Sequence, residues 1–359
     1  MNYSNIALKP DEQAVFSLRE LYGKYGYTHY KMGKFEEYDL YARNRSFLIS
    51  DNILTFTDTN GKLMALKPDV TLSIVKNIGS DDTATHKLFY NENVYRTSAS
   101  SGGFREIMQT GLECIGNIDT YLTCEVLSLA RDSLGLMNAD SLLVLSHMGY
   151  TLGLLEACGL DGKQTAEALE FIKSKNTGAI CALADEAGVD GAKKQALVFV
   201  TKFYGTLRAA CDEIGKYTFN DRMCAACDEL YQILDVMGKD SLFVDFSVVN
   251  DMNYYDGVIF NGYIDGIPES ILSGGRYDRL VSKMGKKAGA IGFAVYMDLL
   301  ERFGESEERY DADVLLVYGD ARASDVAEAS RAIIEEGKTV NAVREDDGKG
   351  KYKEKRYIK

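Results

Sequence analysis

The stretch "VYRTSASSGGFREIMQTGLECIG", residues 94–116, combines the pattern of a β-hairpin with side chains that bind charged ligands. Arg96 and Arg105 lie on either side of a turn rich in serine and glycine. Gln109 and Glu113 follow at even spacing, so an extended strand places them on one face. Arginine binds carboxylate or phosphate, whereas a carboxylate with an amide can hold an ammonium group. The hairpin therefore predicts a site for a small charged ligand within a sheet.

Extended segments continue on both sides of this hairpin. "NILTFTDTNGKLMALKPDVT", residues 52–71, alternates apolar and polar side chains and is interrupted at Asn60-Gly61, a dipeptide typical of tight hairpin turns. Apolar residues at helical spacing predict helices over residues 11–30 and 123–134. The fold class that follows is α+β, an antiparallel sheet flanked by helices.

The pattern changes after residue 145, where helical spacing replaces alternation. "GKQTAEALEFIKSK", "GAKKQALVFVTKFYGTLRAACDEI" and "DRMCAACDELYQILDVMG" predict three helices. Strand patterns return later, with a glycine-rich turn expected at residues 273–276 and a strand–helix–strand pattern from residue 312. The expected domains are the first part of the sheet core (1–145), a helical insertion (146–240), the second part of the core (241–305), and a short C-terminal βαβ segment with a basic tail (306–359). We expect the basic tail to be a solvated terminus.

Composition and charge narrow the classes of protein. The chain of 359 residues is 46% hydrophobic and 26% charged, which is typical of a soluble globular protein. It has no apolar run long enough for a membrane span, and its polar N-terminus has no signal-peptide pattern. Seven scattered cysteines indicate reduced thiols and a cytoplasmic location. A formal net charge of −13 disfavours nucleic-acid binding.

Signatures of several common reaction classes are missing from the sequence. His29, His86 and His147 have no partners at metal-ligand spacing, and Cys224 and Cys227 form a lone CxxC on a predicted helix, where small buried residues are expected. No phosphate-binding loop, serine-hydrolase elbow or dinucleotide fingerprint occurs. We therefore predict neither a metal site nor a cofactor.

A dispersed set of polar residues and glycines remains. Asp69 and Thr71 lie on one face of the expected extended segment "LKPDVT", Tyr254 and Tyr255 lie in "NDMNYYDGVIF", and "SGGRYD" places glycines beside an arginine. Each piece alone is equally compatible with turn glycines and surface ion pairs. Taken together they predict one ligand pocket, formed by Asp69, Thr71, Arg96, Arg105, Gln109, Glu113, Tyr254, Tyr255, Gly274, Gly275 and Arg276.

The order of these motifs resembles the catalytic core of class II aminoacyl-tRNA synthetases, specifically the histidyl branch. "LKPDVT", the hairpin, "NYYDGVIFNGY", "SGGRYD" and "AIGFAVYMDLLE" match the motifs of that branch in order, over residues 10–304. The resemblance implies a class II synthetase-like sheet with a helical insertion. It also implies that Asp69, Thr71, Gln109, Glu113 and the tyrosine pair occupy the places that hold the amino acid.

The chain departs from the synthetase pattern where ATP and the amino-acid carboxylate are held. Ser98 replaces an acidic residue or histidine, and Gly103 and Leu299 replace arginines, the second of which holds the γ-phosphate. Asn250 replaces an arginine that polarises the carboxylate, and Tyr296 stands where a glycine is expected. Adenylation depends on neutralising and orienting these charges. We therefore expect no catalytic residues in this chain.

The same profile resembles the family of ATP phosphoribosyltransferase regulatory subunits. This resemblance implies a non-catalytic chain that assembles with a short-form catalytic subunit into a hetero-octamer, pairs with itself, and mediates feedback by histidine on the first step of histidine biosynthesis. It implies no tRNA partner, because the anticodon-binding-like segment is incomplete.

The sequence is also compatible with two other hypotheses. One is a divergent histidyl-tRNA synthetase-like enzyme that activates an amino acid, which ATP–pyrophosphate exchange would detect. The other is a free-standing amino-acid sensor with a different partner, which co-purification would identify. The place where histidine binds, in the retained pocket or at a subunit interface, also remains open.

Overall fold

A computed structural model describes residues 9–48, 52–79, 84–97, 103–238, 242–249, 254–303 and 310–358. The chain divides into two compact units, Met1–Gly304 and Glu305–Lys359. The larger unit contains the sheet core with the insertion, and the smaller unit has a sheet of its own. None of the helices in the described residues has the length and apolar character needed to span a membrane.

The larger unit is built on a sheet of nine strands in the described residues, in the order β1-β5-β6-β12-β11-β10-β7-β9-β8. Neighbouring strands from β5 to β7 pair antiparallel, whereas β1 pairs parallel with β5 and β9 parallel with β7. The predicted antiparallel sheet with helices is confirmed. The strand bounds are β1 Thr28–His29, β5 His86–Thr97, β6 Phe104–Gly116, β7 Ser141–His147, β8 Gly205–Thr206, β9 Phe243–Val244, β10 Val258–Ile264, β11 Leu272–Arg276 and β12 Gly289–Tyr296.

The hairpin predicted within residues 94–116 forms the strand pair β5–β6. Its register places Arg96 opposite Arg105, and Leu88 opposite Glu113. The second half of β6 is buried, because β12 pairs along its other edge and helices cover the sheet. The turn between the two strands lies outside the described residues.

A second, smaller sheet has the order β2-β4-β3, with β2 Phe35–Glu37, β3 Thr55–Thr57 and β4 Leu63–Leu66. The predicted turn at Asn60-Gly61 is confirmed, because β3 pairs antiparallel with β4 across it. Asp58 Oδ1 accepts hydrogen bonds from the backbone N–H groups of Asn60 and Lys62, both at 2.8 Å. Gly61 has a φ of 81°, a conformation that glycine adopts without strain.

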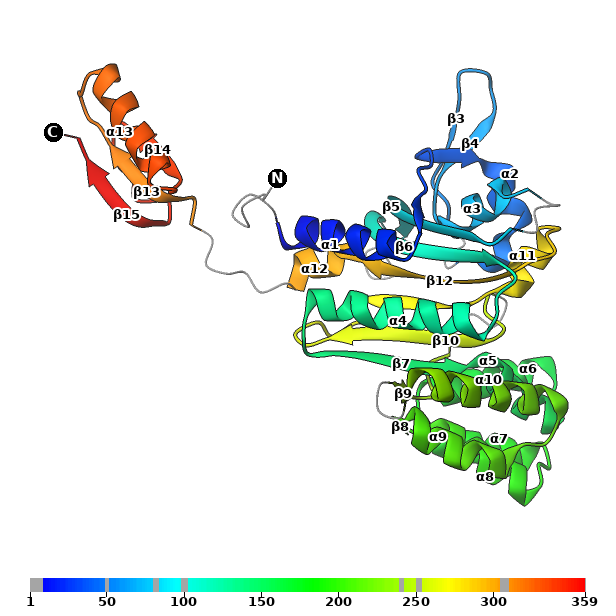
Figure 1. Ribbon diagram of the computed structural model, residues 1–359. Coiled ribbons are helices and arrows are strands. Elements are labelled where there is room, and N and C mark those ends of the chain that lie inside the picture. The colour runs from blue at the N-terminus through cyan, green and yellow to red at the C-terminus, as the bar shows by residue number, and fades with distance from the viewer. Residues whose placement is uncertain are drawn as a thin grey trace. The chain divides into compact units, whose positions relative to one another are not determined.

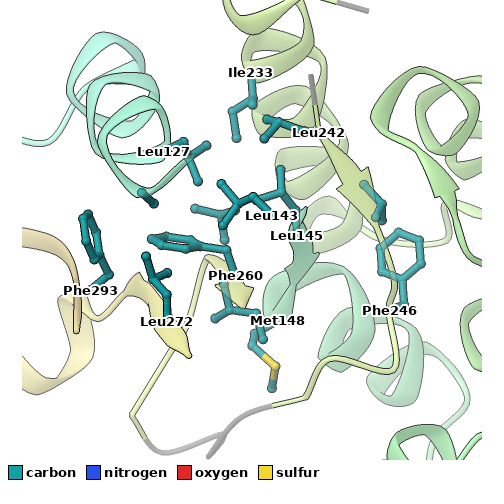
Figure 2. Packing of buried hydrophobic residues seen from close by; sticks show 14 of the residues in the cluster. Leu127, Leu143, Leu145, Met148, Ile233, Leu242, Phe246, Phe260, Leu272 and Phe293 are labelled. Atoms are coloured by element: carbon teal, nitrogen blue, oxygen red, sulfur yellow. The ribbon is translucent and has the colours of Figure 1, made fainter. Parts of the chain in front are cut away.

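Helices α1 and α4 lie along one face of the large sheet (Figure 1). Figure 2 shows the packing beneath α4, where Leu127 faces Phe260, Leu272 and Phe293 from three adjacent strands. The helix expected over residues 11–30 ends earlier, because Gly26 turns the chain with a φ of 81° into β1. The helices of this unit outside the insertion are α1 Pro10–Lys24, α2 Tyr38–Arg43, η1 Arg45–Phe47, α3 Thr71–Asn77, α4 Thr120–Met137, α11 Asp278–Lys283 and α12 Met297–Phe303.

The insertion contains more helices than the three predicted. Residues 148–237, all of which the structure describes, form α5 Met148–Ala157, α6 Gly162–Lys173, α7 Thr177–Glu186, α8 Gly191–Lys202, α9 Leu207–Ile214, η2 Gly215–Tyr217 and α10 Asp221–Met237. The single helix expected over residues 191–214 was wrong, since β8 separates α8 from α9. Side chains of Asp190 and Thr206 cap the two resulting helices, which explains where each begins.

The smaller unit contains β13 Ala312–Val317, α13 Ala323–Glu335, β14 Val340–Val343 and β15 Tyr352–Tyr357. All three strands are parallel, in the order β14-β13-β15. The expectation of a solvated basic tail was wrong for β15, which pairs with the central strand of this sheet. Arg356 bridges to Glu336 and Glu354, so its charge is balanced within the unit.

Candidate functional site

One cavity of about 340 Å³ lies between the large sheet, the start of α3 and the segment that precedes β10. We call it the central cavity. Its lining residues are Phe47, Asp69, Thr71, Tyr90, Arg96, Gln109, Glu113, Tyr254, Tyr255, Ser273, Tyr277, Gly292, Phe293, Ala294 and Tyr296. Seven of the residues predicted from the sequence therefore come together here: Asp69, Thr71, Arg96, Gln109, Glu113, Tyr254 and Tyr255.

Asp69 and Thr71 reach the cavity from the start of α3, which begins at Thr71. The sequence predicted an extended segment here, which was wrong. Asp69 Oδ1 accepts a hydrogen bond of 2.9 Å from the backbone N–H of Leu72, so the carboxylate binds the first turn of the helix. Burial raises the pKa of Asp69, although the positive charge of Arg96 opposes that shift.

Glu113 is the central carboxyl group of the cavity. Its Oε1 accepts a hydrogen bond of 2.6 Å from the Thr71 hydroxyl, and its Oε2 accepts one from the Tyr277 hydroxyl. Gly292 lies opposite on β12, and a Cβ there would stand 1.9 Å from Glu113 Oε2. Burial raises the pKa of Glu113 to about 8. This carboxyl group is therefore mostly protonated at neutral pH.

Arg96 is the one cationic side chain among the described residues that line the cavity. Its Nε donates a hydrogen bond of 2.9 Å to the Pro68 carbonyl, which fixes the guanidinium beside the start of α3. Gln109, only 3% exposed, lies further along β6 and adds an amide. A guanidinium can bind a carboxylate of a ligand in a bidentate manner.

Tyrosines form much of the remaining wall. Tyr254 contacts Tyr255 and Tyr277, with ring centroids 4.6 and 5.7 Å apart. Burial raises the pKa of all three phenols, so they stay neutral and can donate or accept hydrogen bonds. Tyr90 and Tyr277 also line the cavity but were not predicted from the sequence. For Tyr277 the segment "SGGRYD" contained a signal, since Arg276 and Tyr277 must point to opposite faces of an extended strand.

Four of the predicted pocket residues lie elsewhere. Arg105 is 43% exposed and faces Asp298, with 3.7 Å between Nη2 and Oδ2. Arg276 contacts Asp278 and the insertion helix α10 instead of the cavity. The turn expected at residues 273–276 was wrong, because these residues form β11.

The two glycines of that segment serve packing of the protein itself. A Cβ at Gly274 would lie 2.5 Å from the Gly292 carbonyl oxygen, and one at Gly275 would lie 2.7 Å from Tyr255 Cδ1. The neighbouring strand and the tyrosine ring therefore occupy the space that was predicted to hold a ligand.

The positions that depart from the synthetase pattern are scattered. Leu299 is buried on α12, and Gly103 lies just before β6, neither among the residues that line the cavity. Tyr296 does line it, from the end of β12. Ser98 and Asn250 lie outside the described residues.

The chemistry of the central cavity suits a small zwitterion. Asp69 and Glu113 can accept from an ammonium group or a protonated ring, and Arg96 can bind a carboxylate. The volume lies at the lower end of the range for ligand pockets, which fits a molecule the size of an amino acid. Among the described residues, no group of three or more His, Cys, Asp or Glu side chains is placed to hold a metal ion.

The raised pKa of Glu113 leads to a prediction about stability. Between its ordinary pKa of 4.5 and about 8, this group binds more protons in the folded than in the unfolded chain. Its contribution to the free energy of unfolding therefore falls as the pH rises through that window. We expect Glu113→Gln, which cannot titrate, to become more stable relative to the wild type as the pH rises from about 5 to about 8. Urea unfolding of both proteins across this range measures the difference, and parallel pH profiles would contradict it.

Comparison with known proteins places this chain in a family. The sequence model of the family Histidyl-tRNA synthetase matches residues 7–300. The ATP phosphoribosyltransferase regulatory subunit of Clostridium kluyveri is 30% identical over 341 residues, which cover 89% of this chain and 85% of that protein. These matches extend across the sheet core and the insertion.

Solved structures share the fold. A crystal structure from Bacillus halodurans C, described as an ATP phosphoribosyltransferase regulatory subunit/histidyl-tRNA synthetase, has a TM-score of 0.78 at 23% identity and covers all of both chains. A chain of the ATP phosphoribosyl transferase complex from Thermotoga maritima has a TM-score of 0.62 at 17% identity, covering 82% of this chain and 98% of that one. The predicted class II synthetase-like fold is confirmed.

Proposed function

The chain belongs to the family of ATP phosphoribosyltransferase regulatory subunits, and from this premise we propose that it regulates such an enzyme without catalysing the reaction itself. Its partner is a short-form catalytic subunit, which carries the residues that join ATP to phosphoribosyl pyrophosphate in the first step of histidine biosynthesis. Histidine is the effector. The Thermotoga maritima structure, named as a complex, supports a partner of this kind.

The composition of the central cavity supports a regulatory role in which the chain binds an amino acid. The residues that suit an amino acid, Asp69, Thr71, Gln109 and Glu113, are gathered around a ligand-sized space. A triphosphate instead requires several cations, because phosphoryl chemistry depends on neutralising its charge. Arg96 is the one cation among the described lining residues, and Asp69 lies within its electrostatic reach. The site thus favours binding an amino acid over activating it with ATP.

The quaternary state and cellular location belong to the same proposal. In this proposal two copies of the chain form a dimer within a hetero-octamer, and the complex contains no tRNA. The mass of the purified complex tests both statements. The seven cysteines are free thiols, as is usual in a reducing cytoplasm.

Activity of a short-form catalytic subunit, assayed with and without this chain, tests the function directly. We expect phosphoribosyl transfer only when both chains are present, with activity that falls as histidine is added. If the activity of a catalytic subunit from the same genome does not change when this chain is added, the proposal is contradicted.

ATP–pyrophosphate exchange with histidine tests the remaining enzyme hypothesis. We expect no exchange, and exchange above background would favour a divergent synthetase.

A further inference from the structure

Charged side chains connect the insertion to the strand that borders the central cavity. Glu229, on α10, accepts from His147 at 2.7 Å through Oε2 and faces Arg276 Nη1 at 3.4 Å through Oε1. Arg276 Nε in turn donates to Asp278 Oδ2 at 2.9 Å. We call these four residues the insertion bridge. It therefore joins α10 to β7, β11 and α11 through continuous contacts.

The bridge is sheltered enough for its contacts to be specific. The side chains of Glu229 and Arg276 are 23% and 25% exposed, and that of His147 only 4%. Burial alone would raise the pKa of Glu229, but the hydrogen bond from His147 and the charge of Arg276 lower it below its ordinary value. Glu229 is thus ionised at neutral pH and holds both partners.

The backbone around Arg276 connects the insertion bridge to residues that line the central cavity. Tyr277 follows Arg276 and points to the opposite face, where its hydroxyl donates to Glu113. The Arg276 carbonyl accepts a hydrogen bond of 3.2 Å from Asp256 N–H, next to the cavity residue Tyr255. One short stretch of backbone therefore holds a cavity tyrosine on one face and the arginine of the bridge on the other.

The insertion is attached to this stretch at a second point. His147 Nδ1 accepts from the backbone N–H of Tyr150 at 3.3 Å, which caps α5. The backbone N–H of Met148 donates to the Gly257 carbonyl at 2.9 Å. A cavity of about 270 Å³ lies beside these contacts, and Glu229 on α10, Gly257 and Arg276 all line it. A movement of Tyr255 or Tyr277 on ligand binding would displace the atoms that anchor α5 and α10.

We propose that the Glu229–Arg276 contact couples the central cavity to the helical insertion, so that binding of the effector changes how firmly α10 is held against the core. The identity of the effector, histidine, rests on the proposed function; the coupling itself rests on the contacts above. Coupling between two sites is reciprocal, so loosening α10 also changes affinity at the cavity by the same factor.

Hydrogen exchange of the full chain, with and without saturating histidine, tests this coupling. In the wild type we expect histidine to change the exchange rates of α10 amides, residues 221–237, by roughly fivefold or more, the lower end of ordinary coupling. In Glu229→Gln, which keeps the shape but loses the charge, we expect histidine to bind without changing those rates. The matched control is Asp228→Asn, because the Asp228 carboxylate takes part in no ion pair or hydrogen bond within the residues that the structure describes.

The outcomes separate the two proposals. If calorimetry detects no binding of histidine to the wild type, the proposed effector fails. If histidine binds and α10 responds equally in the wild type and in Glu229→Gln, the coupling through the bridge is overturned. A response lost in both Glu229→Gln and Asp228→Asn would also overturn it, since any charge on α10 would then suffice.

Discussion

Glu113→Ala is expected to weaken histidine binding by roughly tenfold to 150-fold, the equivalent of about 1.5–3 kcal/mol for a hydrogen bond to a charged group. Glu113 is 3% exposed, and the described structure gives it two hydroxyl donors that hold its carboxyl group in one orientation. A cationic group of the ligand stabilises the ionised form, so binding near neutral pH also releases a proton from Glu113. Calorimetry in buffers with different ionisation enthalpies measures the affinity and the proton release together.

A matched control for this variant lies on the same strand. Glu106 is exposed, outside the central cavity, and accepts hydrogen bonds from Asn93 and Tyr95. Glu106→Ala should leave the affinity for histidine unchanged. Asp69→Ala should weaken binding as Glu113→Ala does, since both carboxyl groups face the same space. If feedback by histidine in the assembled complex is unchanged in both cavity variants, histidine binds elsewhere, for example at a subunit interface.

Lys67→Met is expected to lower the free energy of unfolding by about 3–5 kcal/mol, the usual cost of leaving one member of a buried ion pair unpaired. The Lys67 ammonium contacts the Glu92 carboxylate, and the two side chains are 1% and 13% exposed. Backbone hydrogen bonds join Lys67 to Lys34 and Tyr95, so the pair lies where the small sheet meets β5. The urea midpoint of the full chain measures the loss.

Two further variants distinguish burial from charge as the cause of this loss. Lys62→Met removes the ion pair with Glu37, whose members are 61% and 57% exposed, and should cost no more than about 1 kcal/mol. The double variant Lys67→Met/Glu92→Leu removes both buried charges and should recover much of the stability. A loss no larger in Lys67→Met than in Lys62→Met would show that the pair is not effectively buried.

Local chemistry made some elements predictable from sequence. Asn60-Gly61 marked a tight turn because glycine adopts a positive φ without strain, and the structure has the hairpin there. The even spacing of Gln109 and Glu113 placed both on one face of a strand, and both line the central cavity. These features depend only on neighbours within a few residues.

Other elements depended on partners far along the chain. "SGGRYD" has the composition of a turn, yet Gly274 and Gly275 lie inside β11, where Gly292 and Tyr255 occupy the space of their missing Cβ atoms. Similarly, "YKEKRY" has the composition of a solvated tail, but pairing with β13 makes it a strand. Composition predicts the conformation that a segment prefers in isolation. The conformation of these two segments is instead determined by the residues that pack against them.

The sequence by itself determined the fold class, the family, and the carboxyl, amide and guanidinium groups of the site. These follow from the order of the motifs and from the alternation of side chains along a strand, which can be read without knowing the fold. Only the tertiary structure decided that Arg105 and Arg276 face away from the central cavity while Tyr90 and Tyr277 close it. It alone decided that Glu229 meets Arg276, residues 47 positions apart in the chain. The register between distant strands and the packing of helices on the sheet determine which face a side chain occupies. No local sequence pattern specifies which distant residue will contact it there.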